Sequence, residues 1–461
     1  MIYTLITNIV IIFSTLIINS TVSKKTILHI LKTYNVILSP SHYLMLVWKN
    51  YNPNYKIVAL LDYFILLPVF IRFERQVTYQ LLQQSTNKGY NFFAGTLLIT
   101  DTDAIETVII NSKFQKRENL IGGKKPPGLN PCCPIFLSSG DDEHILQRKF
   151  FDHEVMNKPI DLSILKNIMT NIFDKFIKPI GESKEPLELI IFISLIYHLT
   201  GKDLTATEID LVELNTNLLS YKSQRIFLLL DLPYLSASTN DIKHKIVSIL
   251  SKHMEEPVHK FIDIMKNTDP GDYCYQSDNK HKIKSSYTNY KDVKTSYIYT
   301  YDKACEIVID LVLFAGVLGT SQLLEECIKN VDKMTGNIDL FIFECARINT
   351  PVTSVNCKYK VPNELFKSGG TLIPDNTLMM CPLSLNHKSN KFENPESFNI
   401  REKQAYSNLL TWNCKSHPYI GTKFNNVTNF NQLNKNNTRI CPGINISFEI
   451  VKTFLKLKSI N

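Results

Sequence analysis

The chain opens on a long apolar run. Residues 1–22 carry no charged side chain, and as a helix they would span about 33 Å, which is enough to cross the hydrocarbon core of a bilayer. Lys24 and Lys25 follow directly, and lysines next to a span mark its cytoplasmic side. A cleavable signal peptide is the alternative, but no positive charge precedes the run and no A-x-A site follows it. We therefore expect a single-pass membrane anchor with the rest of the chain on the cytoplasmic side.

A second apolar stretch, 58–73, is interrupted by Asp62 and Pro68, which favours a buried or membrane-grazing helix over a second span. The expected organisation therefore has three parts. These are the anchor, 1–22, a linker and membrane-proximal segment, 23–57, and a single domain, 58–461.

Within the domain the pattern of apolar positions predicts mostly helices. Residues 97–100 are typical of a short strand, and 103–111 of a helix capped by Asp101 or Thr102. The apolar-periodic segment 444–457 predicts a helix near the end of the chain. The fold class is thus mainly α with small β-sheets, an α+β protein.

Composition narrows the classes of function. The 461 residues include 51 Lys and Arg against 43 Asp and Glu, a formal charge of +8, which suits a membrane surface or an acidic protein partner. These charges are scattered, and no basic helix or RNP-like aromatic motif accompanies them, so no nucleic acid is expected as a partner. Ten cysteines in a chain of this length are too sparse for a disulfide scaffold.

The strongest chemical signal is the segment 438–443, TRICPG, which directly precedes the predicted helix 444–457. Pro442 suits a first helical position, which places Cys441 at the positive end of a helix dipole and near the guanidinium of Arg439. Both effects favour a thiolate. On these residues alone, Cys441 is a nucleophile, a redox thiol, a metal ligand or simply a buried cysteine.

Two further pairs accompany this cysteine. Glu344 and Arg347 lie one helical turn apart, so they can pair across a helix face. His144 and Arg148 are four residues apart on one expected helix face, a spacing that can bind a carboxylate pair. Each pair taken alone is more often a solvated surface feature, and the order of the pieces along the chain makes the pattern specific.

With these motifs in this order, the sequence resembles the cytochrome P450 family of haem-thiolate enzymes over nearly the whole chain after the anchor. The resemblance implies a P450-like fold with haem, iron protoporphyrin IX, as cofactor. It implies that Cys441 is the axial thiolate ligand of the iron and that Arg439, His144 and Arg148 contact the haem propionates. It also implies that Glu344 and Arg347 form the buried E-x-x-R pair of the core.

The distal helix of the family is matched by Ala315 and Gly316, which the resemblance implies lie against the haem. This chain departs from the family there, because Leu318 replaces the acid and Gly319 occupies the position of the threonine. Thr320, the candidate catalytic hydroxyl, comes one residue late, which rotates it by about 100° on a helix. It reaches the oxygen site only if the helix contains a bulge.

Other departures lie near the cysteine. The phenylalanine and the glycine that precede the cysteine in the family signature are replaced by Asn434 and Asn437. The arginine that normally completes the E-x-x-R pair is either Arg401 or absent. The C-terminal hairpin of the family is expected to be missing, because few residues follow Cys441.

The resemblance implies an oxidoreductase, a monooxygenase that inserts one oxygen atom from O₂ into a small apolar organic substrate. Its electrons would come from a separate flavoprotein reductase, since no flavin or NADPH module fits in this length. Two alternatives stay open. One is a reductase-independent isomerase or lyase of lipid hydroperoxides with the same fold, and the other is a degenerate haem-binding protein without turnover.

Overall fold

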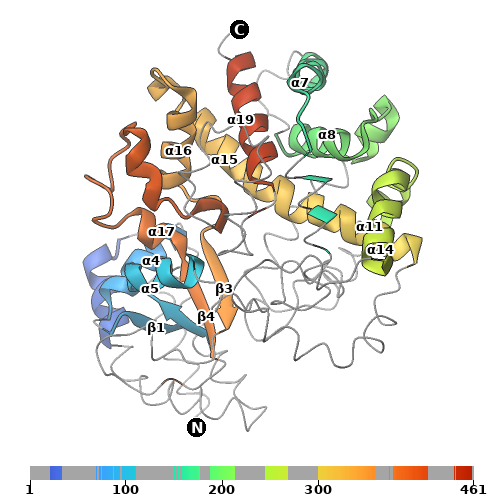
Figure 1. The fold of residues 1–461 in the computed structure, drawn as a ribbon. Helices are drawn as coiled ribbons and strands as arrows, with labels where there is room; N and C mark the ends of the chain where they lie inside the picture. Colours follow the sequence, from blue (N-terminus) through green and yellow to red (C-terminus); the bar gives the residue numbers. More distant parts are fainter. Residues whose placement is uncertain are drawn as a thin grey trace. The chain divides into compact units, whose positions relative to one another are not determined.

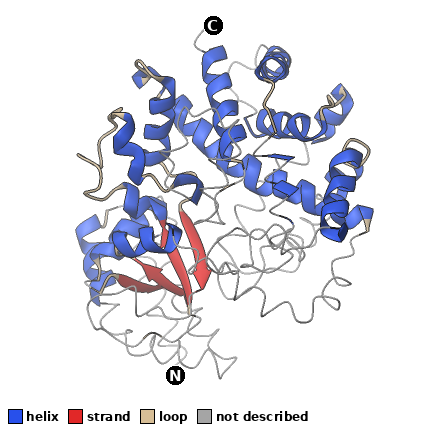
Figure 2. Ribbon diagram, in the orientation of Figure 1, coloured by secondary structure: helices blue, strands red, loops and turns tan. Residues whose placement is uncertain are grey.

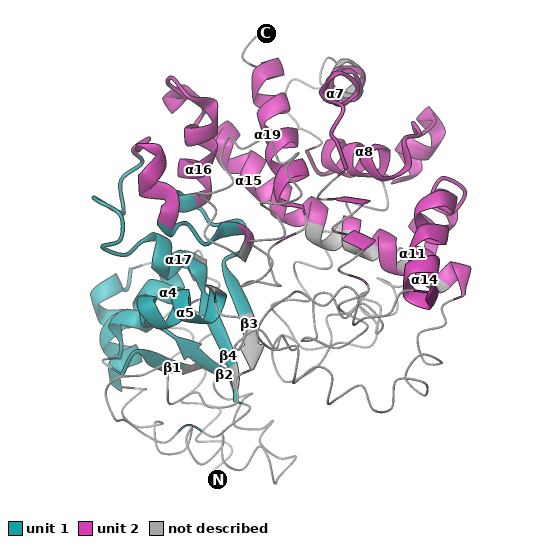
Figure 3. Ribbon diagram, viewed as in Figure 1, with its two compact units in different colours: residues 1–124, 347–398, 408–411 teal, residues 125–346, 399–407, 412–461 magenta. Residues whose placement is uncertain are grey.

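The chain is mainly helical in the computed structural model, and the described residues form one small mixed sheet, as the α+β prediction required (Figures 1 and 2). The structure describes residues 21–33, 69, 72–73, 75–86, 88–93, 96–110, 147, 150–151, 154–155, 158–176, 187–212, 244–267, 300–358, 373, 377–413, 441 and 443–458. They fall in two compact units (Figure 3). The first unit is drawn from 1–124, 347–398 and 408–411, and the second from 125–346, 399–407 and 412–461.

The first unit is built on a four-stranded sheet in the order β1-β2-β4-β3. Its central strands β2 and β4 run parallel, and each edge strand is antiparallel to its neighbour. The strands are β1 (Tyr90–Phe93), β2 (Thr96–Ile99), β3 (Ser354–Lys358) and β4 (Leu378–Pro382). The strand predicted at 97–100 is thereby confirmed, one residue earlier than expected.

Three helices accompany this sheet, namely α4 (Arg75–Gln84), α5 (Thr102–Ile110) and α17 (Leu383–His387) (Figure 1). The predicted helix 103–111 is confirmed as α5, and Asp101 is its cap. The Asp101 carboxylate accepts the backbone N–H groups of Asp103 at 3.0 Å and Ala104 at 2.8 Å, which satisfies donors that have no partner inside the helix.

The core of this unit includes residues from the predicted linker. Residues 24–33 form a helix, and its Ile27 and Leu31 are fully buried in the same apolar cluster as β2 and β4. The predicted anchor lies outside the described residues, except for positions 21 and 22. Of the helices that the structure does describe, none combines the length and the apolar character needed to cross a bilayer.

The second unit is a bundle around α8 (Leu187–Thr200), whose residues are buried on nearly every side. A helix that is apolar all round belongs in a protein core, and α7, α15 and α19 pack against it. The principal helices of this unit are α7 (Leu162–Phe176), α8, α11 (Glu255–Asn267), α14 (Tyr301–Leu311), α15 (Leu318–Lys329) and α19 (Ile444–Lys458).

Helix α16 (Ile338–Ile348) contributes to both units, because the division between them falls after Ala346. A π-helical segment, η5 (Val312–Val317), joins α14 to α15 in one continuous run. The structure also describes helical residues 206–212 and 244–250 and the 3₁₀ turns η6 (Val331–Lys333), η8 (Lys403–Asn408) and η9 (Thr411–Asn413).

Candidate functional site

Cys441 lies on the turn that leads into α19, the helix predicted at 444–457. The first helical residue, Ile444, donates its backbone N–H to the Cys441 carbonyl at 3.3 Å. The cysteine is half-buried, and a Cβ added at Gly443 would lie 3.7 Å from its sulfur. The sulfur of this half-buried residue therefore lies close to the first turn of α19.

Trp412 holds the backbone of this cysteine. The Cys441 N–H donates to the Trp412 carbonyl at 2.9 Å, and Trp412 adopts a left-handed conformation with φ of 63°. This conformation costs a bulky residue about 1–3 kcal/mol and persists only where its surroundings enforce it. The indole ring packs edge-on against Phe343 at 6.0 Å and Phe448 at 6.4 Å. An aromatic cluster thus fixes the carbonyl to which Cys441 is bound, and no local sequence pattern indicates it.

The bulge that Thr320 requires is present just before α15. Residues Val312–Val317 form the π-helical segment η5, which contains Ala315 and Gly316. A Cβ at Gly316 would lie 2.6 Å from the Leu195 side chain of α8, so a larger residue there would require that side chain to move. The side chain of Ala315 is not among those described, and the haem contacts expected for both residues stay predictions.

Two neighbouring positions of α15 meet different surroundings. Thr320 is buried, and its hydroxyl donates to the Ser447 hydroxyl on α19 at 3.0 Å. A Cβ at Gly319 would meet nothing within 4 Å. Among the described residues, Gly319 therefore has open space beside it, and Thr320 faces the helix that carries the cysteine turn. Ser447 was not foreseen from the sequence, and its place six residues after Cys441 is the only available signal.

Glu344 of α16 is fully buried in a polar network of the second unit. Its carboxylate accepts the Asn399 N–H at 2.9 Å, Arg401 Nη1 at 2.6 Å and the Tyr406 hydroxyl at 3.1 Å. Arg401 is thus confirmed as the third partner that the sequence left open. Burial and the adjacent Glu344 carboxylate raise the pKa of Tyr406, so Tyr406 stays a neutral donor.

Arg347, also fully buried, belongs to the first unit. Its guanidinium donates to three backbone carbonyls, those of His387 at 3.1 Å, Pro395 at 2.5 Å and Ser397 at 2.7 Å. It also lies over the Phe392 ring, 5.4 Å from the centroid. Both residues of the E-x-x-R motif are therefore fully buried and hydrogen-bonded, and the solvated-surface reading of the motif is wrong.

His387 is buried within the network of Arg347 and is held in its neutral form. The Leu410 backbone N–H donates to His387 Nε2 at 2.8 Å, so Nε2 carries no proton. Nδ1 must then carry it, and it donates to the Thr350 hydroxyl at 2.8 Å. Burial, followed by the positive charges of Arg347 and Lys388, lowers the pKa of His387 to about 3.

This histidine predicts an acid-labile fold. The pKa of His387 is about 3 in the folded protein and near 6.5 in an unfolded chain. Between these pH values the histidine is protonated in the unfolded chain and neutral in the folded one. The stabilisation is complete above pH ~6.5 and is lost as the pH falls towards ~3. We expect His387→Gln to remove a slope of about 1.4 kcal/mol per pH unit between pH ~6 and ~4, measured by urea unfolding. The same slope in the wild-type and His387→Gln proteins would contradict this assignment. His29→Gln, a substitution at an exposed histidine, is the control.

Three residues expected at the haem propionates, His144, Arg148 and Arg439, lie outside the described residues. Within the part of the chain that the structure describes, no cluster of His, Cys, Asp and Glu could itself hold a metal ion. The donor chemistry nevertheless fits a haem, because a half-buried cysteine, whose thiolate can ligate iron, lies on the turn before α19, and α15 packs directly against that helix.

No protein-family model and no curated protein matches the sequence significantly. Solved structures do match the fold. P450BioI in complex with a hexadec-9Z-enoic acid ligated acyl carrier protein has a TM-score of 0.55 and 12% identity, over 84% of this chain and 90% of that one. Epothilone B-bound cytochrome P450epoK has a TM-score of 0.53 and 12% identity, over 83% and 88%. The open form of cytochrome P450 EryK from S. erythraea has a TM-score of 0.53 and 13% identity, over 83% of this chain and 87% of that one. The chain therefore has a cytochrome P450-like fold, in a divergent form.

Proposed function

We propose that this chain is a membrane-anchored haem-thiolate monooxygenase. It inserts one oxygen atom from O₂ into a small apolar organic substrate, with electrons from a separate flavoprotein reductase, and residues 1–22 anchor it with the haem domain on the cytoplasmic side. The observation that carries the proposal is Cys441, which lies half-buried on the turn into α19 of a P450-like fold. No other described cysteine is exposed in this way, since the remaining four are buried.

In this proposal Cys441 ligates the iron, and His144, Arg148 and Arg439 bind the propionates. When bound, the haem supplies O₂ activation and oxygen transfer. The residues of the chain have supporting roles. Trp412 fixes the backbone of Cys441 through its carbonyl, and the close contact of Gly316 with Leu195 sets the path of the π-segment along α8.

Proton delivery is the task for which Thr320 is the candidate. Its hydroxyl donates to Ser447, and hydroxyl hydrogens rotate readily, so the direction of the bond can reverse. Ser447 would then donate to Thr320, and Thr320 could pass its own proton towards the open space beside Gly319. Monooxygenation needs this reversal.

The surroundings of Gly319 and Thr320 also favour a second function. With open space beside Gly319 and the Thr320 hydroxyl directed at α19, the site can work without a proton-donating hydroxyl. An isomerase or lyase that rearranges lipid hydroperoxides has this property, because its oxygen arrives already bonded to the substrate. Such an enzyme needs no reductase.

We expect Thr320→Ala and Ser447→Ala to lower reductase-driven product formation to a similar extent, because both break one proton path, and positioned proton transfer contributes about 10²–10⁴-fold to a rate. The measurement compares turnover with reductase and NADPH against turnover with a lipid hydroperoxide alone. Ser321→Ala is the matched control, because its hydroxyl bonds only to the Leu318 carbonyl one turn earlier.

The outcomes separate the candidates. Reductase-driven product that is sensitive to Thr320 and Ser447 supports the monooxygenase. Turnover with hydroperoxide alone, unaffected by either substitution, would replace it with the rearranging enzyme. A protein that binds haem but turns over with neither oxidant would be the degenerate haem-binding protein.

A further inference from the structure

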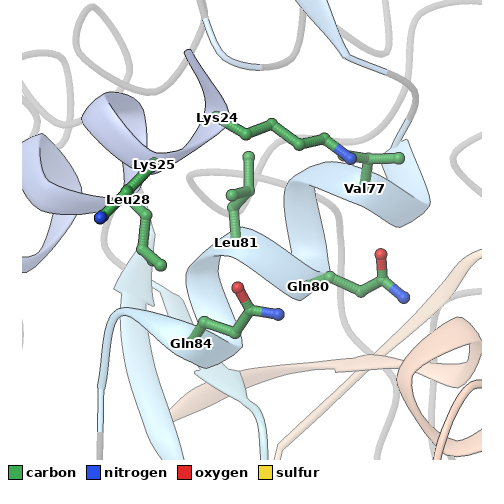
Figure 4. A pocket seen from close by; sticks show the side chains of 7 residues that line it. All are labelled: Lys24, Lys25, Leu28, Val77, Gln80, Leu81 and Gln84. Carbon is green, nitrogen blue, oxygen red and sulfur yellow. The ribbon is translucent and has the colours of Figure 1, made fainter.

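A hollow of about 250 Å³ lies between the helix 24–33 and α4, within the first unit and apart from the cysteine turn (Figure 4). Its lining combines apolar side chains with basic and amide groups and contains no acid. The lining residues are Lys24, Lys25, Leu28, Val77, Gln80, Leu81 and Gln84. At about 30 Å³ per water, the hollow holds roughly eight waters, which suits a small head group and is too small for a haem.

The charge around the hollow is positive and unbalanced. Lys24 and Lys25 occupy the first turn of their helix, whose N-terminus is capped by the Ser23 hydroxyl through the Thr26 N–H at 3.1 Å. Cations in a first turn add to the positive end of the helix dipole. Neither lysine has an acidic partner among the described residues, so an anion in the hollow would relieve this repulsion.

One carboxylate lies near the far edge of the hollow, and it is already occupied. Glu396 accepts the Gln80 amide N–H at 2.8 Å and pairs with Lys388 at 3.4 Å. The Glu396 carboxylate is therefore already engaged, whereas the Lys24 ammonium, which reaches over α4 to Val77 in Figure 4, has no acidic partner among the described residues. An anionic group is expected at this basic position, beside the Lys24 ammonium.

The apolar side chains lie next to this basic end. Figure 4 shows the Lys24 side chain extended over α4 towards Val77, with Leu81 pointing into the space below it. Leu28 and Val77 are only partly buried. A free inorganic anion would use the lysines and leave these apolar groups in water, whereas an amphiphile would use both kinds of surface.

We propose that this hollow binds the anionic phosphate head of a phospholipid. The phosphate lies at the Lys24 ammonium, Lys25 adds positive charge at the next position of the helix, and the first part of the lipid body covers Leu28, Val77 and Leu81. The uncharged run 1–22 immediately precedes Lys24 in the sequence, which brings the hollow close to any bilayer that this run enters. The choice of a lipid rests on the membrane anchor of the proposed function, but no residue of the cysteine turn is involved, so lipid binding and haem ligation are tested separately.

The test measures binding of monomeric dihexanoyl phosphatidylglycerol to the full chain by isothermal titration. Lys24→Gln combined with Lys25→Gln is expected to weaken binding at least tenfold. Lys32→Gln, the same charge change on the exposed end of the same helix, is expected to leave binding unchanged. Zwitterionic dihexanoyl phosphatidylcholine and inorganic phosphate are both expected to bind at least tenfold more weakly than phosphatidylglycerol.

Three outcomes would overturn the proposal. Binding of phosphatidylglycerol that survives the double substitution would place the lipid elsewhere. Equal binding of phosphatidylcholine would remove the role of the anionic charge. Equal binding of inorganic phosphate would mean that the apolar side chains contribute nothing and that the site takes a free anion. Because both lysines are exposed, the double variant is expected to fold, which its unchanged melting temperature will verify.

Discussion

Glu344→Ala is expected to cost about 3–5 kcal/mol of folding free energy, the usual penalty for removing one partner of a buried ion pair. The carboxylate is fully buried and binds Arg401 at 2.6 Å, and the Arg401 side chain is itself only 9% exposed. Without Glu344 that guanidinium has lost its charged partner, and the Tyr406 hydroxyl and the Asn399 N–H lose an acceptor. We expect much less soluble protein and loss of haem in parallel.

Arg347→Ala is expected to behave in the same way, because three backbone carbonyls lose their donor. Urea unfolding and haem content of the purified protein measure both effects. Glu256→Ala, which removes an exposed pair with Lys260, is the control and should change little, since exposed ion pairs contribute little to stability. Normal stability and normal haem content in the Glu344 or Arg347 variant would contradict the structural role assigned to the motif.

Cys441→Ser is expected to abolish the thiolate-type spectrum and all turnover while leaving the fold intact. Two bonds that hold this residue in place come from its backbone, to Trp412 and Ile444, and serine preserves them. Haem absorption spectra, with circular dichroism as the measure of folding, test the prediction.

Cys381→Ala is the control for this substitution, because Cys381 is a buried cysteine of β4. We expect it to lose some stability through the missing sulfur and to keep the thiolate spectrum. A Cys441→Ser protein that retained the thiolate spectrum would show that another sulfur is the ligand.

Features encoded locally were predictable from the sequence. Helix α5 begins where Asp101 can cap it, helix α19 follows its apolar periodicity from Ile444, and β2 lies within one residue of the expected strand. In each of these cases neighbouring residues determine the backbone. A bulge was only the condition under which Thr320 could reach the oxygen site, and a π-helical segment does precede α15.

Features formed between distant segments could not be predicted in this way. The left-handed conformation of Trp412 is enforced by Phe343 and Phe448, which lie far from it in the chain. The bond from Thr320 to Ser447 exists only because α15 and α19 pack together. A helix also forms within the expected linker, because Ile27 and Leu31 find an apolar core that their own segment does not reveal.

The most direct test of the central claim is the reduced, CO-bound absorption spectrum of the wild-type protein reconstituted with haem. If Cys441 on the turn before α19 ligates the iron, the spectrum will show the red-shifted Soret band of a haem with a thiolate ligand. No haem binding, or a band typical of histidine ligation or of an iron without a protein ligand, would contradict the haem-thiolate account of this chain.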